Sequence, residues 1–218
     1  MNHAELKARH RAIRDQQKPD LSVRIHRALS WLERAERETD DHDARFVFSW
    51  IAFNAAYATY IHEDYRETEQ AQFGGFVSKL LALDDQRRLA DMVWQSFAGP
   101  LRVLLGSKFI YSEFWRYQSG HIGPHEWAAR FQRDNQRALA ALAQNNTHGV
   151  LSVALSRIYT LRNQLVHGGA TWQSTVNREQ VTTCARILDR LVPIVIELMM
   201  DHPDALWGEA VYPVVTDE

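Results

Sequence analysis

The residues best suited to chemistry lie in the segment RNQLVH (residues 162–167), which two glycines follow. The imidazole of His titrates near neutral pH, so it can take a proton from one oxygen and give one to another. Arg presents a rigid fork of N–H donors that binds phosphate and stabilises charge developing at phosphorus. This pair predicts chemistry at a phosphodiester, with His167 as acid and base and Arg162 on the phosphate.

The spacing of this pair is weak evidence when taken alone. An Arg followed five residues later by a His occurs three times, as Arg37 with His42, Arg116 with His121 and Arg162 with His167. The first two pairs run through polar or Gly-containing linkers, and we interpret them as chance matches. Only the third joins an amphipathic helix, a polar residue after Arg, an apolar Leu-Val pair and a glycine stop, so its context selects it.

Geometry limits how these two side chains can meet. Five residues on a straight α-helix rotate by about 140°, so Arg162 and His167 do not share one face. They converge only if the helix frays or turns at Gly168, or if two copies of the segment meet across a dimer axis.

Hydrophobic periodicity predicts an all-α helical bundle, because apolar residues recur mostly at spacings of three and four. One early segment, residues 43–61, is apolar almost all round and should be buried. Its amide Asn54 is interpreted as a structural tie to neighbouring backbone. A helix is expected to open at Pro124. The helix that carries the RNQLVH segment should run from about residue 147 to 166 and stop at Gly168.

Further helices are expected on both sides of these. An N-terminal helix should stop before Pro19, and others should cover residues 67–83 and 85–97, the last capped by Asp84. Residues 99–124 should be irregular with short helical pieces. Asn177 should cap the last long helix. The C-terminal tail is apolar enough to dock on the bundle through Trp207, Tyr212 and Pro213.

Other candidates for chemistry have simpler interpretations. No phosphate-binding loop, nucleophile elbow or HExxH zinc motif occurs in the sequence. His121 and His125 have a metal-like spacing, but Gly123 and Pro124 lie between them, so one helix face cannot hold both. The single cysteine, Cys184, sits in a helix-like run without a nearby His and is interpreted as a buried structural residue. No metal or cofactor is expected.

The segment YTLRNQLVHGG resembles the RNxxxH motif of the HEPN superfamily (higher eukaryotes and prokaryotes nucleotide-binding domains). The resemblance extends to the layout, with an aromatic-rich early helix (RFVFSWIAFNAAY) and a motif helix followed by one last long helix. It implies a single HEPN-like domain over residues 1–218. The core would be residues 20–66 and 124–202, and residues 67–123 would be an insertion of extra helices.

The same resemblance implies a function. Many members of the superfamily are metal-independent endoribonucleases. Arg162, Asn163 and His167 map onto their motif, which implies that Asn163 orients the other two residues. It implies a homodimer with paired motifs in a cleft, a role as toxin or phage-defence effector, and restraint by an antitoxin such as a nucleotidyltransferase. The alternative is a noncatalytic helical module that binds nucleotide, RNA or a protein partner.

Composition sets the broad class. The net charge is -2 and the pI about 6.6, so any RNA contact needs a local basic patch. One cysteine allows no disulfide within the chain, which fits a reducing compartment. The charged N-terminus lacks the apolar stretch of a signal peptide, and the run LVPIVIELMM is too short to span a bilayer. These features predict a cytoplasmic protein without a membrane partner.

Overall fold

The computed structural model describes residues 1–59 and 69–212, with side chains described for residues 1–59 and 71–212. Helices make up 77% of the described residues, which form no strands beyond an isolated bridge between Thr59 and Ala210. The all-α prediction is therefore confirmed. The chain groups into two compact units: unit 1 is Met1–Glu67 with Leu188–Glu218, and unit 2 is Thr68–Ile187.

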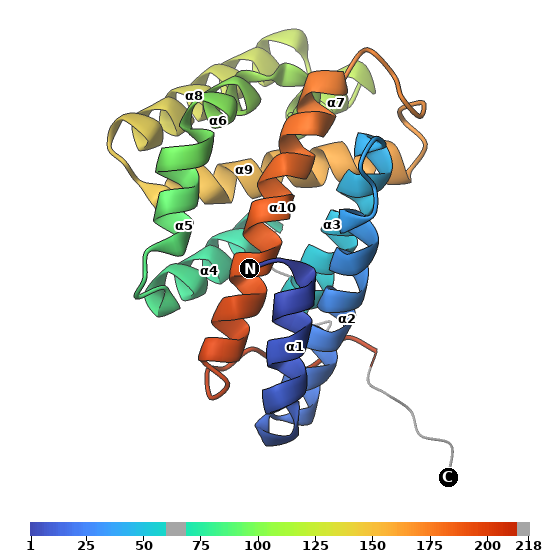
Figure 1. Ribbon diagram of the computed structural model, residues 1–218. Coiled ribbons are helices and arrows are strands. Elements are labelled where there is room, and N and C mark those ends of the chain that lie inside the picture. Colours follow the sequence, from blue (N-terminus) through green and yellow to red (C-terminus); the bar gives the residue numbers. More distant parts are fainter. Residues whose placement is uncertain (60–68, 213–218) are drawn as a thin grey trace. The chain divides into compact units, whose positions relative to one another are not determined.

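Unit 1 contains three helices that lie side by side in Figure 1, α1 (His3–Ile13), α2 (Pro19–Glu36) and α3 (His42–Tyr57). It also contains the part of α10 (Arg178–Asp201) that begins at Leu188. A short 3₁₀ helix, Arg14–Gln16, follows α1. Pro19 opens α2, where its missing N–H costs no hydrogen bond, so the predicted stop before Pro19 is confirmed. Asp41 caps α3 by accepting from the Ala44 N–H at 2.9 Å, and the short loop makes α2 and α3 a helical hairpin.

Helix α3 fills the core of unit 1, as its apolar sequence predicts. Phe46, Phe53 and Ala56 are fully buried. The interpretation of Asn54 as a buried tie is wrong, because this side chain is exposed. The predicted helix end at residue 61 lies outside the described residues.

The C-terminal tail docks through Trp207, which is buried, but not through Tyr212, which is 83% exposed. The tail is held by polar contacts as well, because the guanidinium of Arg24 donates to the carbonyls of Trp207 and Gly208. Pro213, the third residue expected to dock, lies outside the described residues.

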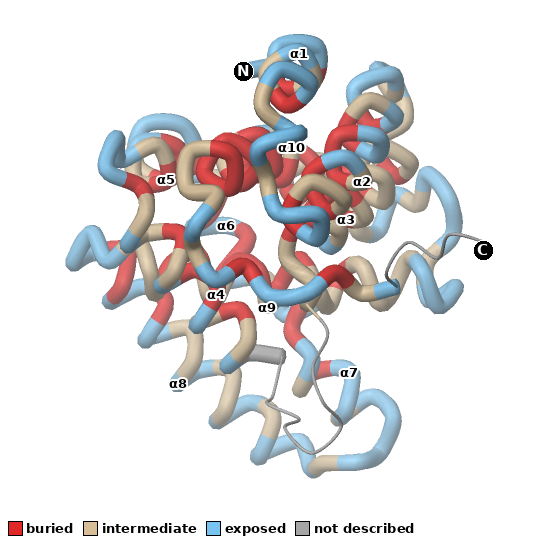
Figure 2. The backbone as a smooth tube through the Cα atoms, turned by 90° about the horizontal axis from the view of Figure 1, so that it is seen from below, coloured by how far each residue is buried: buried red, intermediate tan, exposed pale blue. Residues whose placement is uncertain are grey.

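Unit 2 contains the RNQLVH segment. Its helices are α4 (Glu69–Leu83), α5 (Arg88–Asp91), a π-helical stretch (Met92–Phe97), α6 (Ala98–Gly106), a 3₁₀ turn (Lys108–Ile110), α7 (Ser112–Gln118), α8 (Pro124–Ala143), α9 (Thr147–Val166) and the start of α10 (Arg178–Asp201). Helix α9 contacts α4, α6 and α8 and is the central element of the unit. Helix α8 is exposed or half-buried along most of its length, as its tan and blue tube shows in Figure 2.

The predicted helix over residues 85–97 is only partly right. Arg87 adopts a left-handed backbone (φ 57°), so the helix begins at Arg88 and becomes π-helical from Met92. Asp84 does bind the start of this helix, since its carboxylate accepts from the Leu89 N–H at 2.7 Å, but the observed cap position is Arg87, about one turn later.

The division into one core and one insertion stays a prediction. The contacts group residues 124–187 with the segment 68–123, whereas we expected 124–202 to group with residues 20–66. Among the described residues, no helix is long and apolar enough to cross a membrane.

Candidate functional site

The RNQLVH segment forms the last turn of α9, as predicted. Asn146 caps the start of α9 by accepting from the Gly149 N–H at 2.9 Å. At the other end Gly168 has a left-handed backbone (φ 71°), its N–H bonds to the Leu165 carbonyl, and the Gly169 N–H bonds to the Gln164 carbonyl. These two bonds are those of a Schellman motif, which explains why the helix stops here.

The structure brings Arg162 and Asn163 together. The Arg162 Nη1 donates to the Asn163 Oδ1 at 2.9 Å, and both side chains are half-buried. The Arg162 Nε is buried and has no hydrogen-bond partner among the described residues. Asn163 thus holds the guanidinium of Arg162 in place, and its role in orienting both Arg162 and His167 stays a prediction.

His167 stands apart from this pair. It is the C-cap residue of α9 and is exposed, and its backbone N–H donates to the Asn163 carbonyl at 3.0 Å. No hydrogen bond joins its imidazole to Arg162 or Asn163 within the described part of the chain. The turn that could bring the imidazole back toward Arg162 begins only at Gly168, after His167, so the divergence expected for a straight helix is retained.

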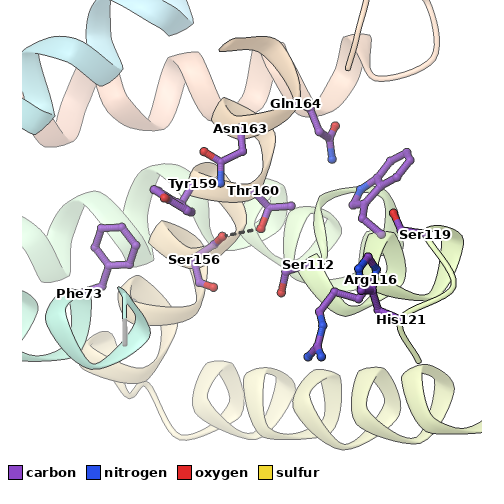
Figure 3. A pocket seen from close by; sticks show the side chains of 11 residues that line it. Phe73, Ser112, Arg116, Ser119, His121, Ser156, Tyr159, Thr160, Asn163 and Gln164 are labelled. Atoms are coloured by element: carbon purple, nitrogen blue, oxygen red, sulfur yellow. Dashed lines mark hydrogen bonds between the residues drawn. The ribbon is translucent and has the colours of Figure 1, made fainter. Parts of the chain in front are cut away.

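A cavity of about 600 Å³ lies in unit 2 beside the RNQLVH segment, and we call it the α9 cavity. Its lining residues come from α4, α7, the turn after α7, and α9: Phe73, Ser112, Trp115, Arg116, Ser119, His121, Ser156, Tyr159, Thr160, Asn163 and Gln164. In Figure 3, Phe73 lies at one end, Arg116, Ser119 and His121 lie at the other, and the α9 side chains run between them. Of the three predicted site residues, Asn163 lines this cavity, whereas Arg162 and His167 do not.

The face of α9 that lines the cavity is polar. Its residues follow the helical repeat and are Ser156, Tyr159, Thr160, Asn163 and Gln164. This repeat usually carries the apolar residues that face a core. Hydroxyl and amide groups at these positions provide hydrogen-bond donors and acceptors along one side of the cavity.

One backbone carbonyl links two walls of the α9 cavity. The Phe109 carbonyl accepts from the indole N–H of Trp115 at 2.8 Å and from the Gln164 amide at 2.6 Å. The other end of the Gln164 amide accepts from Asn177 at 3.2 Å. Since Trp115 is on α7 and Gln164 is on α9, these bonds hold the two side chains in fixed positions.

A buried cation holds the chain where it enters α7. Arg157, on α9, is 3% exposed and lies over the Tyr111 ring at 4.3 Å, while the Tyr111 hydroxyl donates to Asp134 at 2.7 Å. Burial lowers the pKa of Arg157 to about 10, which still leaves it charged at neutral pH. Burial also raises the pKa of Tyr111, and the bond to Asp134 raises it further. Tyr111 directly precedes α7, so this cluster ties the start of α7 to α8 and α9.

Arg116 and His121, which we interpreted as a chance pair, both line the α9 cavity. Helix α7 ends in its own Schellman motif at Gly120 (φ 74°): the Gly120 N–H bonds to the Tyr117 carbonyl, and the His121 N–H bonds to the Arg116 carbonyl at 2.9 Å. Here the turn lies between the Arg and the His. It therefore brings the backbone of His121 back to the turn of α7 that carries Arg116.

Two other candidates from the sequence have little scope for chemistry. Cys184 is fully buried, and burial raises the pKa of its thiol, so the reactive thiolate is disfavoured. Among the described side chains, those of residues 1–59 and 71–212, no three His, Cys, Asp or Glu side chains lie close enough to form a metal site.

Comparison of the chain with protein-family models, with curated proteins and with solved structures finds no match.

Sequence reasoning missed most of the residues that line the α9 cavity. One signal was available, because Ser156, Tyr159, Thr160 and Asn163 are polar or aromatic at the spacing that marks one helix face. The partners of this face on α7 lie about 40 residues earlier, in the stretch expected to be irregular, so the cavity could not be derived from local patterns.

Proposed function

We propose that this chain is a metal-independent endoribonuclease of the HEPN type, with His167 as acid and base and Arg162 on the phosphate. The observation that carries the proposal is the end of α9. There an exposed imidazole lies one turn beyond a guanidinium that a neighbouring amide holds in place. An accessible His and an oriented Arg are the two groups that phosphodiester cleavage needs.

The proposed reaction uses the RNA itself as nucleophile. The 2′-hydroxyl gives its proton to an imidazole, and its oxygen bonds to the adjacent phosphorus. The bond from phosphorus to the 5′-oxygen breaks, and that oxygen takes a proton from an imidazolium. The products are a 2′,3′-cyclic phosphate and a 5′-hydroxyl. The guanidinium of Arg162 stabilises the extra negative charge on the phosphorane oxygens.

A second copy of the chain is part of the proposal. His167 and Arg162 diverge on α9, so a His167 from one protomer facing an Arg162 from its partner gives the required pair. Apolar side chains are exposed around the end of α9, where Val166 is 50%, Trp172 69% and Val176 72% exposed. Exposed apolar groups clustered around a functional group favour an interface there.

The mass of the protein in solution tests the dimer. We expect light scattering at micromolar concentration to give twice the chain mass of 25.2 kDa. Val176→Asp should shift the population to single chains, because it places a charge at the interface. Leu139→Asp, at a 40%-exposed position on α8, is the control and should leave the mass unchanged. A wild-type protein that stays a single chain would contradict the dimer.

The activity is tested with single-stranded RNA in buffer that contains EDTA. We expect slow cleavage that EDTA does not suppress, because His and Arg supply the proton transfers and the charge. DNA of the same sequence should stay intact, since it lacks the 2′-hydroxyl. The RNA fragments should carry 2′,3′-cyclic phosphate ends when analysed by mass spectrometry. Cleavage of DNA, or RNA fragments with 5′-phosphate ends, would rule out this mechanism.

A noncatalytic binding module is the second candidate, and one observation favours it. Arg162 is half-buried with its Nε enclosed, so its guanidinium presents only part of its donors to a ligand.

If the chain is a nuclease, the resemblance to toxin and defence proteins extends the proposal to a cytoplasmic effector restrained by an antitoxin, for instance a nucleotidyltransferase. Copurification with the product of a neighbouring gene tests that extension.

A further inference from the structure

We propose that the α9 cavity binds one nucleoside monophosphate unit, with its phosphate on Arg116 and His121 and its base between the aromatic side chains. This proposal shares Asn163 with the nuclease site but does not rest on the nuclease, because the groups that would bind the phosphate are Arg116 and His121, and neither Arg162 nor His167 lines the cavity. The volume of about 600 Å³ is in the range of small-molecule sites, which lies roughly between 300 and 1,000 Å³.

The charge at one end of the cavity suits an anion. The lining residues include the cations Arg116 and, when protonated, His121, and they include no carboxylate within the described part of the chain. Arg116 is bound to Glu113, which lies outside the lining, at 3.0 and 3.2 Å. Both of these bonds use Nη1, so the edge formed by Nε and Nη2 can still make the two parallel bonds that Arg forms with phosphate.

The carboxylate of Glu113 is shared between two cations. Besides Arg116 it accepts from Arg130, on α8, whose other amino group binds Glu126 at 2.6 Å. Because Arg130 also satisfies Glu113, a phosphate that recruits Arg116 does not leave this carboxylate without a partner. The ion pair therefore orients Arg116 without preventing it from binding an anion.

The rest of the cavity suits a planar, hydrogen-bonding ring. Tyr159 packs edge-on against Phe73 at 5.9 Å, and the indole N–H of Trp115 is bound to a carbonyl, so these rings have fixed positions. Nucleic-acid bases stack on aromatic rings of this kind whatever the base, because every base presents a π-face. The Asn163 side chain points toward Tyr159 and Thr160 in Figure 3, and its amide N–H can donate to a base edge.

The test uses adenosine 5′-monophosphate as the probe and isothermal titration calorimetry as the readout. We expect the wild-type chain to bind this probe with a dissociation constant of about 1 mM or below. Adenosine and inorganic phosphate should each bind at least about 10-fold more weakly, because each lacks half of the contacts. Equal binding of adenosine and its monophosphate, or no binding of the monophosphate, would overturn the proposal.

Variants locate the phosphate. Arg116→Ala should weaken binding about 10- to 100-fold, the effect of losing charged hydrogen bonds, and Arg116→Lys should recover only part of it, because Lys lacks the fork. The matched control is Arg133→Ala, which removes an Arg from α8 that pairs with Asp134 and does not line the cavity. Melting curves show whether each variant is folded. Unchanged binding in a folded Arg116→Ala would contradict the assignment.

Two further arms identify the source of the nucleotide and separate this site from the nuclease. His167→Ala protein should bind the monophosphate like wild type even though it has lost cleavage, so the two proposals fail independently. A short 5′-phosphorylated oligoribonucleotide should compete with the monophosphate in that variant, and the tighter of the two probes identifies free nucleotide or RNA as the natural source. Oligoribonucleotide binding that the monophosphate does not displace would contradict a site for a single nucleotide unit.

Discussion

Replacing His167 by Ala is expected to reduce the rate of RNA cleavage by roughly 10²–10⁴-fold, the contribution of one positioned acid and base. Replacing Arg162 by Ala should cause a loss of about 10²–10³-fold, since it removes a donor aimed at the developing charge. The measurement is the initial rate of cleavage of a defined single-stranded RNA in EDTA. Both variants should keep the helical circular dichroism spectrum of the wild-type chain.

The structural cost of these two changes differs, and the difference makes them informative. His167 is exposed and only its backbone is bonded within α9, so His167→Ala should leave the melting temperature nearly unchanged. Arg162→Ala removes the bond to Asn163 and should cost about 0.5–1.5 kcal/mol of unfolding free energy. A loss of activity in His167→Ala at unchanged stability therefore reports on chemistry rather than on folding.

His42→Ala is the control, because it disrupts another pair with the same spacing. His42 is the first residue of α3, in unit 1, and we expect full activity in this variant. If wild type and His167→Ala degrade RNA at the same rate after careful purification, the activity belongs to a contaminant. The noncatalytic module then becomes the better account.

The parts of the fold that could be predicted are those that local residues determine. Pro19 and Pro124 open helices because they lack the N–H that a first turn leaves unpaired. Gly168 ends α9 because its φ of 71° is a conformation that side chains disfavour. The burial of α3 follows from the apolar residues of the helix itself, which can be read from its own sequence.

The parts that could not be predicted depend on contacts that local sequence does not show. The π-helical stretch over Met92–Phe97 has no signal in residue propensity, and Pro100 then falls in the first turn of α6, where its missing N–H is tolerated. The apolar sequence of α3 predicts a buried Asn54, but this side chain is exposed, because the apolar residues of the helix do not show which position is left uncovered.

The position of the RNQLVH segment at the end of α9 was predictable, because its glycine stop is a local signal. The role of Arg162, Asn163 and His167 stays a prediction, and the surroundings of the segment could not be predicted. The α9 cavity requires α7 to face α9, and this depends on long-range contacts such as the bonds that Trp115 and Gln164 donate to one carbonyl. The pair Arg116 and His121 was dismissed for the glycine between them. That glycine is what turns the chain so that both residues line one cavity.

The second large effect is expected in unit 1, where Arg24→Ala should lower the free energy of unfolding by about 2–4 kcal/mol. Arg24 is 1% exposed, and its guanidinium donates to the carbonyls of Ala56, Trp207 and Gly208. Burial lowers the pKa of Arg24 to about 10, so the side chain is still charged at neutral pH and makes charged hydrogen bonds. Removing it leaves three carbonyls without this donor.

Gly208 shows that the tail fits its place closely. Its φ is 80°, and a Cβ at this position would lie 2.7 Å from the Thr59 Cγ2. A side chain at this position would therefore contact Thr59 too closely and would strain the backbone, so the path of the tail past Arg24 depends on this glycine. Loss of Arg24 should release the tail before the helices of unit 1 unfold, so the amides of residues 207–210 should exchange with solvent faster than in the wild-type chain.

Arg27→Ala is the matched control on the same helix. Arg27 also donates to two tail carbonyls, those of Val211 at 2.8 Å and Tyr212 at 2.6 Å, but at a more exposed position. Water can replace those bonds, so we expect a loss of about 1 kcal/mol or less. Chemical denaturation of the three proteins measures the difference. Equal stability of Arg24→Ala and Arg27→Ala would contradict this prediction. It would mean that the cost of desolvating the Arg24 guanidinium offsets the free energy gained from its bonds to the three carbonyls.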